Sequence, residues 1–222
     1  PTLFRSRLHR ASTITFFFPP PGVPRSHRPP LPKRAALEAI VETFAAYGNG
    51  AFTLHHFVPF QTDGWVQLIL VLMMIAGATN VTLAFLLLRR RQWRALVGNP
   101  EWRFFLTLLA AAITVVGLLL YWAKSRDALA LPGLDPVRDA AFHVTSVATG
   151  TGLWSYNFAY WPAGTLLVLL LVMVVGGSAG SAAGGIKAFR ALTLLKLVGR
   201  ELRRLVPPKA VIPLRVEIGR AP

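Results

Sequence analysis

The amino-acid sequence predicts an all-α polytopic membrane protein, and three observations support this class. Of the 222 residues, 54% are hydrophobic and 15% are charged, whereas a soluble globular domain has about 25% charged residues. No Asp, Glu, Lys or Arg occurs between Asp139 and Lys187, a stretch that a water-exposed domain would not leave uncharged. Several apolar runs also approach or reach the length that crosses a bilayer core of about 30 Å. The absence of cysteine excludes a disulfide framework and a thiolate metal site.

Three apolar runs are candidate membrane spans. The first is Trp65–Leu88, and the second is Phe104–Trp122, which is entered through Asn99-Pro100-Glu101, a typical helix start with a cap, a proline and an acid in the first turn. The third, Trp161–Val175, is shorter and ends in glycine. Tryptophans stand near the ends of these runs, where an interfacial aromatic belt is expected; they are Trp65, Trp93, Trp102, Trp122 and Trp161.

The net charge of +15 would suit a nucleic-acid-binding protein if the basic residues were spread among polar ones. They are clustered instead, after the first and the third apolar runs, so we expect both clusters on the cytoplasmic side and no nucleic-acid partner. The link between the second and third runs carries balanced charges and is expected outside. The two basic clusters are Arg89, Arg90, Arg91 and Arg94, and Lys187, Arg190, Lys196, Arg200, Arg203 and Arg204.

Residues 1–34 differ from the rest of the chain. They hold eight of the seventeen prolines, seven basic residues and no acid. A transit peptide or a lipid-surface anchor is one interpretation; we expect instead a disordered or misjoined segment.

The outer link contains a further element that predicts a re-entrant pore loop. Asp135-Pro136 forms a helix start, and Val137–Ala148 reads as a helix too short to span the membrane. The segment Thr149–Leu153, rich in Thr and Gly, cannot continue that helix. Non-helical backbone at membrane depth is stable only when it is buried in protein or lines a watery path. The alternative is a simple loop turn.

Such a segment can bind a dehydrated cation. Backbone carbonyls of an extended Thr/Gly strand replace the hydration shell, with glycine allowing the required positive φ. The preceding helix directs the negative end of its dipole at the same place. On that helix, His143 is expected to be a packing residue.

Shifting the chain by 101 residues reveals a weak internal repeat. Gly48–Phe52 then falls on Thr149–Leu153, and a change of one residue in the offset places Ile75–Gly77 on Val175–Gly177. The shared order is helix, Gly-rich strand, aromatic residue, apolar helix and small residues. Repeats of this kind commonly surround a central site in transporters.

A second glycine-rich segment, Val175–Lys187, interrupts the third apolar run. It lacks the adjacent Gly-Lys of a phosphate-binding loop, because Ile186 separates Gly185 from Lys187. Close packing of small residues is another interpretation, but five glycines between Gly176 and Gly185 break a helix rather than pack it. An unwound, mobile loop below a filter would be a natural gate.

The histidines indicate no catalytic site, because none has a carboxylate or serine partner at a useful spacing. His55-His56 is expected to be an exposed loop pair rather than a metal site. We therefore expect a protein that is not an enzyme.

The pore loop and the glycine segment together resemble the TrkH/KtrB-type potassium uptake family of cation transporters. The most specific similar stretches are the pore loop at 142–152, the Trp161-Pro162 helix start and the glycine segment at 176–187. Further similar stretches are 75–80, 99–103, 200–207 and 210–211. The similarity runs in register over roughly 36–217.

The resemblance implies a potassium-channel-like subunit with four helix–pore-loop–helix repeats in pseudo-fourfold arrangement around one K⁺ path. It also implies a homodimer in the plasma (inner) membrane, in contact with lipid and with a cytosolic, nucleotide-binding TrkA-like regulatory subunit. K⁺ is the transported ion, and no covalently bound cofactor is implied. By position, the filter would comprise Thr149, Gly150, Thr151 and Gly152, its neighbouring quarter Gly48, Asn49, Gly50 and Ala51, and the gating loop Gly176, Gly177, Gly180, Gly184 and Gly185.

The expected organisation is an incomplete repeat at 35–92, a complete repeat at 93–206 and a cytoplasmic linker at 207–222. Three departures from the family pattern stand out. Ala51 replaces a filter glycine, which costs about 1 kcal/mol or more if φ is positive there. Residues 1–34 do not resemble the expected outer helix. Two quarters of a filter cannot enclose an ion, so the chain alone is not expected to conduct. The alternatives are an inactive truncated or frameshifted transporter fragment and a non-transporting membrane interaction protein.

Overall fold

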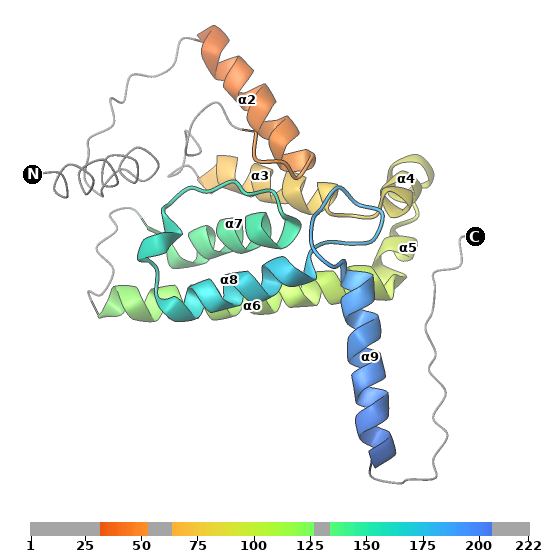
Figure 1. The fold of residues 1–222 in the computed structure, drawn as a ribbon. Coiled ribbons are helices and arrows are strands. Elements are labelled where there is room, and N and C mark those ends of the chain that lie inside the picture. The colour runs from red at the N-terminus through yellow and green to blue at the C-terminus, as the bar shows by residue number, and fades with distance from the viewer. Residues whose placement is uncertain (1–31, 53–63, 127–133, 206–222) are drawn as a thin grey trace, which may run out of the picture.

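The computed structural model describes residues 32–52, 64–126 and 134–205, and within them the regular structure is entirely helical (Figure 1). The pair His55-His56, residues 1–31 of the first segment and the whole of segment 207–222 lie outside the described residues. The first described helix begins at Pro32, slightly before the expected boundary at residue 35. The elements are α2 (Pro32–Tyr47), α3 (Gly64–Gly77), α4 (Val81–Arg90), α5 (Trp93–Gly98), α6 (Pro100–Ser125), α7 (Pro136–Thr149), the 3₁₀ helix η1 (Phe158–Tyr160), α8 (Ala163–Val175) and α9 (Ala188–Leu205).

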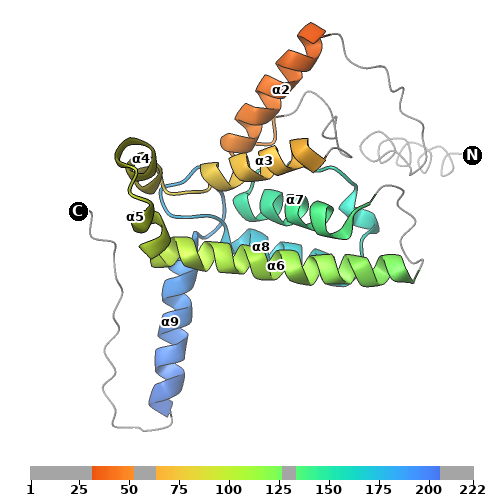
Figure 2. The same cartoon turned by 180° about the vertical axis from the view of Figure 1, so that it is seen from behind.

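Helix α7 is the centre of the fold, between α3 on one side and α6 with α8 on the other (Figure 1 and Figure 2). The face of α6 toward it is an apolar stripe with spacings of three and four residues, as a helix buried along one side requires. This stripe packs with residues of α7 and α8 into the larger core cluster. Its members on α6 are Phe105, Leu109, Ala112, Val116 and Leu120.

A second core cluster connects the two expected repeats. Ala46 of α2 and Leu70 and Met74 of α3 meet Phe142 of α7 and Leu153 in the segment after α7. All five side chains are buried. The first and second halves of the chain therefore share one apolar core beside the two predicted filter segments.

The predicted second span is confirmed as helix α6. The Asn99 side chain accepts hydrogen bonds from the backbone N–H groups of Glu101 and Trp102 at 2.9 and 3.1 Å, and Pro100 occupies the first turn. With 26 residues, α6 is the one described helix that is by itself long and apolar enough to cross a membrane. The third run forms α8, which has 13 residues.

The apolar run Trp65–Leu88, a candidate span, is not one continuous helix. The run forms α3 and α4, which meet at an angle of 109°, and Asn80 caps the new helix by accepting from the N–H of Thr82 at 2.8 Å. The carbonyls of Gly77 and Ala78 accept hydrogen bonds from the glycine-rich loop, a hundred residues later in the chain. Because those partners are distant in sequence, local composition did not reveal the break.

Two of the five tryptophans expected in an aromatic belt lie in the core instead. Trp65, Trp93 and Trp122 are exposed, as interfacial residues should be, but Trp102 and Trp161 are buried in the larger core cluster. Trp161 packs against the ring of His143, with the ring centroids 4.6 Å apart. Position at the end of an apolar run therefore did not distinguish a membrane-facing ring from one that closes the core.

Candidate functional site

Helix α7 is fixed at both ends by its own sequence. At the N-terminus, an Asp135 carboxylate oxygen accepts hydrogen bonds from the N–H groups of Val137 and Arg138, both at 3.0 Å. The bond from the Arg138 N–H is the main reason that the pKa of Asp135 lies below its ordinary value. At the C-terminus, Gly150 adopts φ 75° and donates its N–H to the last turn. The predicted short helix is therefore present, but it runs one residue further than expected and includes Thr149.

The segment after α7 is held by buried hydroxyl groups. The Oγ1 atoms of Thr149 and Thr151 are 2.6 Å apart, and Thr149 also donates to the carbonyl of Thr145 at 2.9 Å. Ser146 Oγ donates to the carbonyl of Leu153 at 2.6 Å. Within the described part of the chain, no hydrogen bond uses the carbonyl oxygens of residues 150–152.

The first predicted filter segment follows α2 in the same way. Gly48 and Gly50 donate their N–H groups to the carbonyls of Phe44 and Ala45 at 2.8 and 3.0 Å, and Asn49 is buried with φ 48°. Ala51 is not among the described residues with positive φ. The strain expected at Ala51 is therefore absent, and the left-handed non-glycine residue of this segment is Asn49.

The two predicted filter segments lie against each other, although they are 102 positions apart. Thr151 Oγ1 donates to Asn49 Oδ1 at 3.0 Å. A Cβ atom on Gly152, which has φ 74°, would be 3.1 Å from the Cβ of Ala51. Predicted residues of both segments thus meet, with Asn49 and Thr151 buried and Ala51 and Gly152 exposed.

The predicted gating loop folds back onto this place. Helix α8 ends at Gly176, and the loop returns so that the Gly184 N–H donates to the carbonyl of Thr149 at 3.1 Å. Gly176 and Gly185 pack backbone on backbone: a Cβ on Gly185 would be 2.5 Å from the Gly176 Cα. A helix, not a strand, precedes the loop, which argues against the phosphate-binding interpretation.

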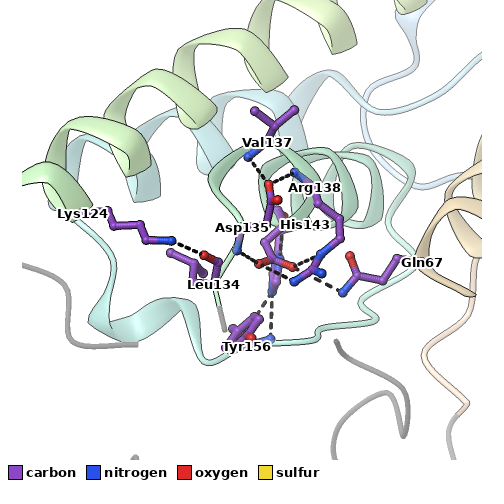
Figure 3. A network of polar contacts seen from close by, with 9 residues as sticks. Gln67, Lys124, Leu134, Asp135, Val137, Arg138, His143 and Tyr156 are labelled. Carbon is purple, nitrogen blue, oxygen red and sulfur yellow. Dashed lines mark hydrogen bonds and ion pairs between the residues drawn. The ribbon is translucent and has the colours of Figure 1, made fainter. Parts of the chain in front are cut away.

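Sequence reasoning missed the polar network at the start of α7 (Figure 3). The Asp139 carboxylate, fully buried, accepts from the Asp135 N–H at 2.8 Å, from Gln67 of α3 at 3.3 Å and from Arg138 at 3.3 Å. Lys124 donates to the carbonyl of Leu134 at 2.8 Å. The signal available was an acid in the first turn of a helix, but its partner on α3 is 72 residues away.

His143 is a buried packing residue, as expected, but it is also hydrogen-bonded. Its Nδ1 donates to the carbonyl of Asp139 at 2.9 Å, and its Nε2 accepts from the Tyr156 N–H at 3.4 Å (Figure 3). Through these bonds the ring connects α7 to the chain that leads from the filter segment to α8.

The geometry defines a class of protein: a helical protein in which two short helices, α2 and α7, end at glycine-containing segments that contact each other, and in which one long apolar helix, α6, could cross a membrane. The sequence profile of the TrkH family, described as "Cation transport protein", matches residues 24–220. The chain belongs to this family.

Relatives and a solved structure agree with this assignment. The chain is 31% identical over 182 residues to the Trk system potassium uptake protein TrkH of Salmonella typhimurium, covering 82% of this chain and 37% of the relative. It is 32% identical over 180 residues to TrkH of Halomonas elongata, covering 81% and 36%. The crystal structure of the potassium transporter TrkH from Vibrio parahaemolyticus superimposes with a TM-score of 0.67 at 29% identity, covering 78% of this chain and 37% of that one. The chain therefore spans little more than a third of the length of these relatives.

Proposed function

We propose that the chain forms two adjacent quarters of the K⁺ path in a TrkH-type potassium uptake protein. The observation that carries the proposal is the contact between the two filter segments, since Thr151 donates to Asn49 and each segment follows its own short pore helix. The printed names of the relatives describe potassium uptake proteins. The quarters would belong to repeats at 35–92 and 93–206.

In this proposal the carbonyl oxygens of residues 150–152 and of the segment 48–51 replace the hydration shell of K⁺. The C-termini of α2 and α7 direct negative dipole ends toward the ion. The loop 176–185 acts as the gate, since it contacts the end of α7 at Thr149. Ion passage through such a path needs no covalent chemistry from the protein.

The remaining features of the proposal follow the family resemblance. The protein would be a multi-pass protein of the plasma membrane, assembled as a homodimer and regulated by a cytosolic TrkA-like subunit. The rival interpretations, an inactive fragment and a membrane interaction protein whose glycines only pack helices, predict no K⁺ transport.

The test is growth of an uptake-deficient host on limiting K⁺, with the complete reading frame that encodes the chain. We expect growth with the unmodified protein and its loss with Gly152→Ser, because a side chain there meets both a positive φ and the Cβ of Ala51. Gly98→Ser is the matched control, since nothing lies within 4 Å of a Cβ at that position. No growth despite confirmed membrane expression would exclude the transporter proposal.

A further inference from the structure

The tip of the glycine loop is held by two side chains that come from other helices. The Ala179 N–H donates to Glu101 Oε1 at 2.5 Å, and Asn80 Nδ2 donates to the carbonyl of Ala179 at 2.6 Å. The backbone N–H and C=O of Ala179 are thus both hydrogen-bonded to side chains, which lie 78 and 99 positions away in the sequence. We call Asn80, Glu101 and Ala179 the tip clamp.

Both side chains of the tip clamp stand on fixed elements. Asn80 uses its other amide atom, Oδ1, to cap α4 by accepting from the Thr82 N–H at 2.8 Å. Glu101 lies in the first turn of α6, two residues after the Asn99 cap, and is 8% exposed. A buried carboxylate that accepts a backbone N–H makes a charge-assisted bond, which is stronger than a neutral one. The clamp therefore restrains the loop tip relative to α4 and α6.

The C-terminal part of the same loop, at Gly184, contacts the end of α7 beside the predicted filter. Gly184 donates its N–H to the carbonyl of Thr149, and a Cβ on Gly150 would be 3.1 Å from the Gly184 nitrogen. The loop is thus fixed at Ala179 by the tip clamp, and at Gly184 it contacts the end of α7. Because Ala179 is held in place, a movement of the loop at Gly184 away from α7 is restrained by the tip clamp.

We propose that Glu101 is a positioning residue for the gate: with Asn80, it holds the loop against the inner end of the filter and so limits how often the path opens. The inference rests on the proposed function of the loop as the gate. It predicts that loss of the carboxylate shifts the equilibrium toward the open loop without changing the filter itself. The rate of transport would change, and the affinity and selectivity would not.

The variants are Glu101→Ala, Glu101→Gln and Asn80→Asp, which keeps the α4 cap but loses the donor to Ala179. Glu201→Ala on α9 is the matched control, because that carboxylate is 52% exposed and lies outside the loop contacts. Initial Rb⁺ uptake is measured against concentration in cells that express the complete reading frame. We expect Glu101→Ala to raise the maximal rate about fivefold or more, the lower range of a typical conformational coupling. The half-saturating concentration and the Rb⁺/Na⁺ ratio stay unchanged.

Glu101→Gln retains an acceptor oxygen and is expected to have a smaller effect, whereas Asn80→Asp changes the maximal rate in the same direction as Glu101→Ala. Unchanged maximal rates in all three variants, or a change in selectivity equal to the change in rate, would overturn the inference. If Glu101→Ala does not reach the membrane, the other two variants decide the question by the same criteria.

A second measurement separates this inference from the proposed function. The chain contains no cysteine, so a single Ser181→Cys in the loop, with any cysteine elsewhere in the reading frame replaced, reports loop exposure to a charged thiol reagent. We expect faster modification when Glu101→Ala is added, and an equal rate would contradict the clamp. If the unmodified protein transports no K⁺, the proposed function fails, while this accessibility still tests the clamp.

Discussion

At the scale of single residues, the pair Thr151–Asn49 is the most informative contact, because it joins two segments that the repeat alone relates. Thr151→Val keeps the shape of the side chain and removes the hydroxyl that donates to Asn49 Oδ1. Leaving a buried acceptor without its donor costs about 1–3 kcal/mol. Because this hydrogen bond joins the two predicted filter segments, its loss destabilises their contact with each other. We expect the K⁺/Na⁺ uptake ratio to fall by about tenfold.

Competitive uptake of Rb⁺ and Na⁺ measures this ratio. Thr107→Val is the control, since Thr107 is exposed on α6 and bonds only to its own helix through the Phe104 carbonyl. An unchanged ratio in Thr151→Val, with normal membrane levels, would show that this hydrogen bond does not shape the filter.

The sequence indicates which residue types form the proposed filter, but it does not indicate their backbone conformations. Thr and Gly in a short segment after a capped helix indicate exposed carbonyls whatever the wider fold. The positive φ at Asn49 rather than Ala51 depends on how the turn after α2 packs under α3, where a Cβ on Gly77 would meet the carbonyl of Tyr47. Such a contact is not encoded in the segment itself.

At the scale of elements, α7 is the helix that the sequence defines best, because its cap, first-turn proline and C-terminal glycine are all local signals. Asp135→Ala removes the cap and is expected to lower the free energy of unfolding by about 1 kcal/mol at neutral pH. Thermal unfolding of the detergent-solubilised protein measures the change, with Asp135→Asn as the variant that keeps a capping oxygen without the charge.

The same cap predicts a pH dependence. The pKa of Asp135 in the folded protein is lowered, so its contribution to stability is present above the unfolded value of about 3.9 and is lost as the pH falls through the folded value. The stability difference between the unmodified protein and Asp135→Asn should therefore shrink on acidification below about pH 4. A difference that stays constant down to this range would show that the charge at the cap contributes nothing.

The break between α3 and α4 shows where local reasoning fails for an element. The run Trp65–Leu88 has the composition of one span, and Asn80 is a weak signal within it. The carbonyls of Gly77 and Ala78 leave the helix pattern because Ala182 and Ser178 of the glycine loop supply the hydrogen bonds. The loop and the break form one unit, which the sequence presents as two unrelated small-residue stretches.

At the scale of the whole molecule, the cytoplasmic side of the two basic clusters stays a prediction, and the arrangement of the helices agrees with a shared side. Helices α4 and α5 carry most of the first basic cluster, and α9 carries much of the second. All three helices lie at the same end of α6 and α8 (Figure 1). The C-terminal end of α6 and the N-terminal end of α7, which flank the balanced link, lie at the other end of the bundle (Figure 1). The distribution of charge along the chain can be read from the sequence without knowing any contact. The hydrogen bonds Gln67–Asp139 and Glu101–Ala179 cannot, because their partners are distant in sequence.

The central claim is that K⁺ binds between the two filter segments. The most direct test is an experimental structure of the complete protein in Rb⁺ or Tl⁺, whose anomalous scattering locates the ion without reference to activity. The account predicts a peak at coordination distance from carbonyl oxygens of residues 150–152 and of 48–51. A well-ordered filter region without such a peak, in protein that binds Rb⁺ in solution, would contradict it.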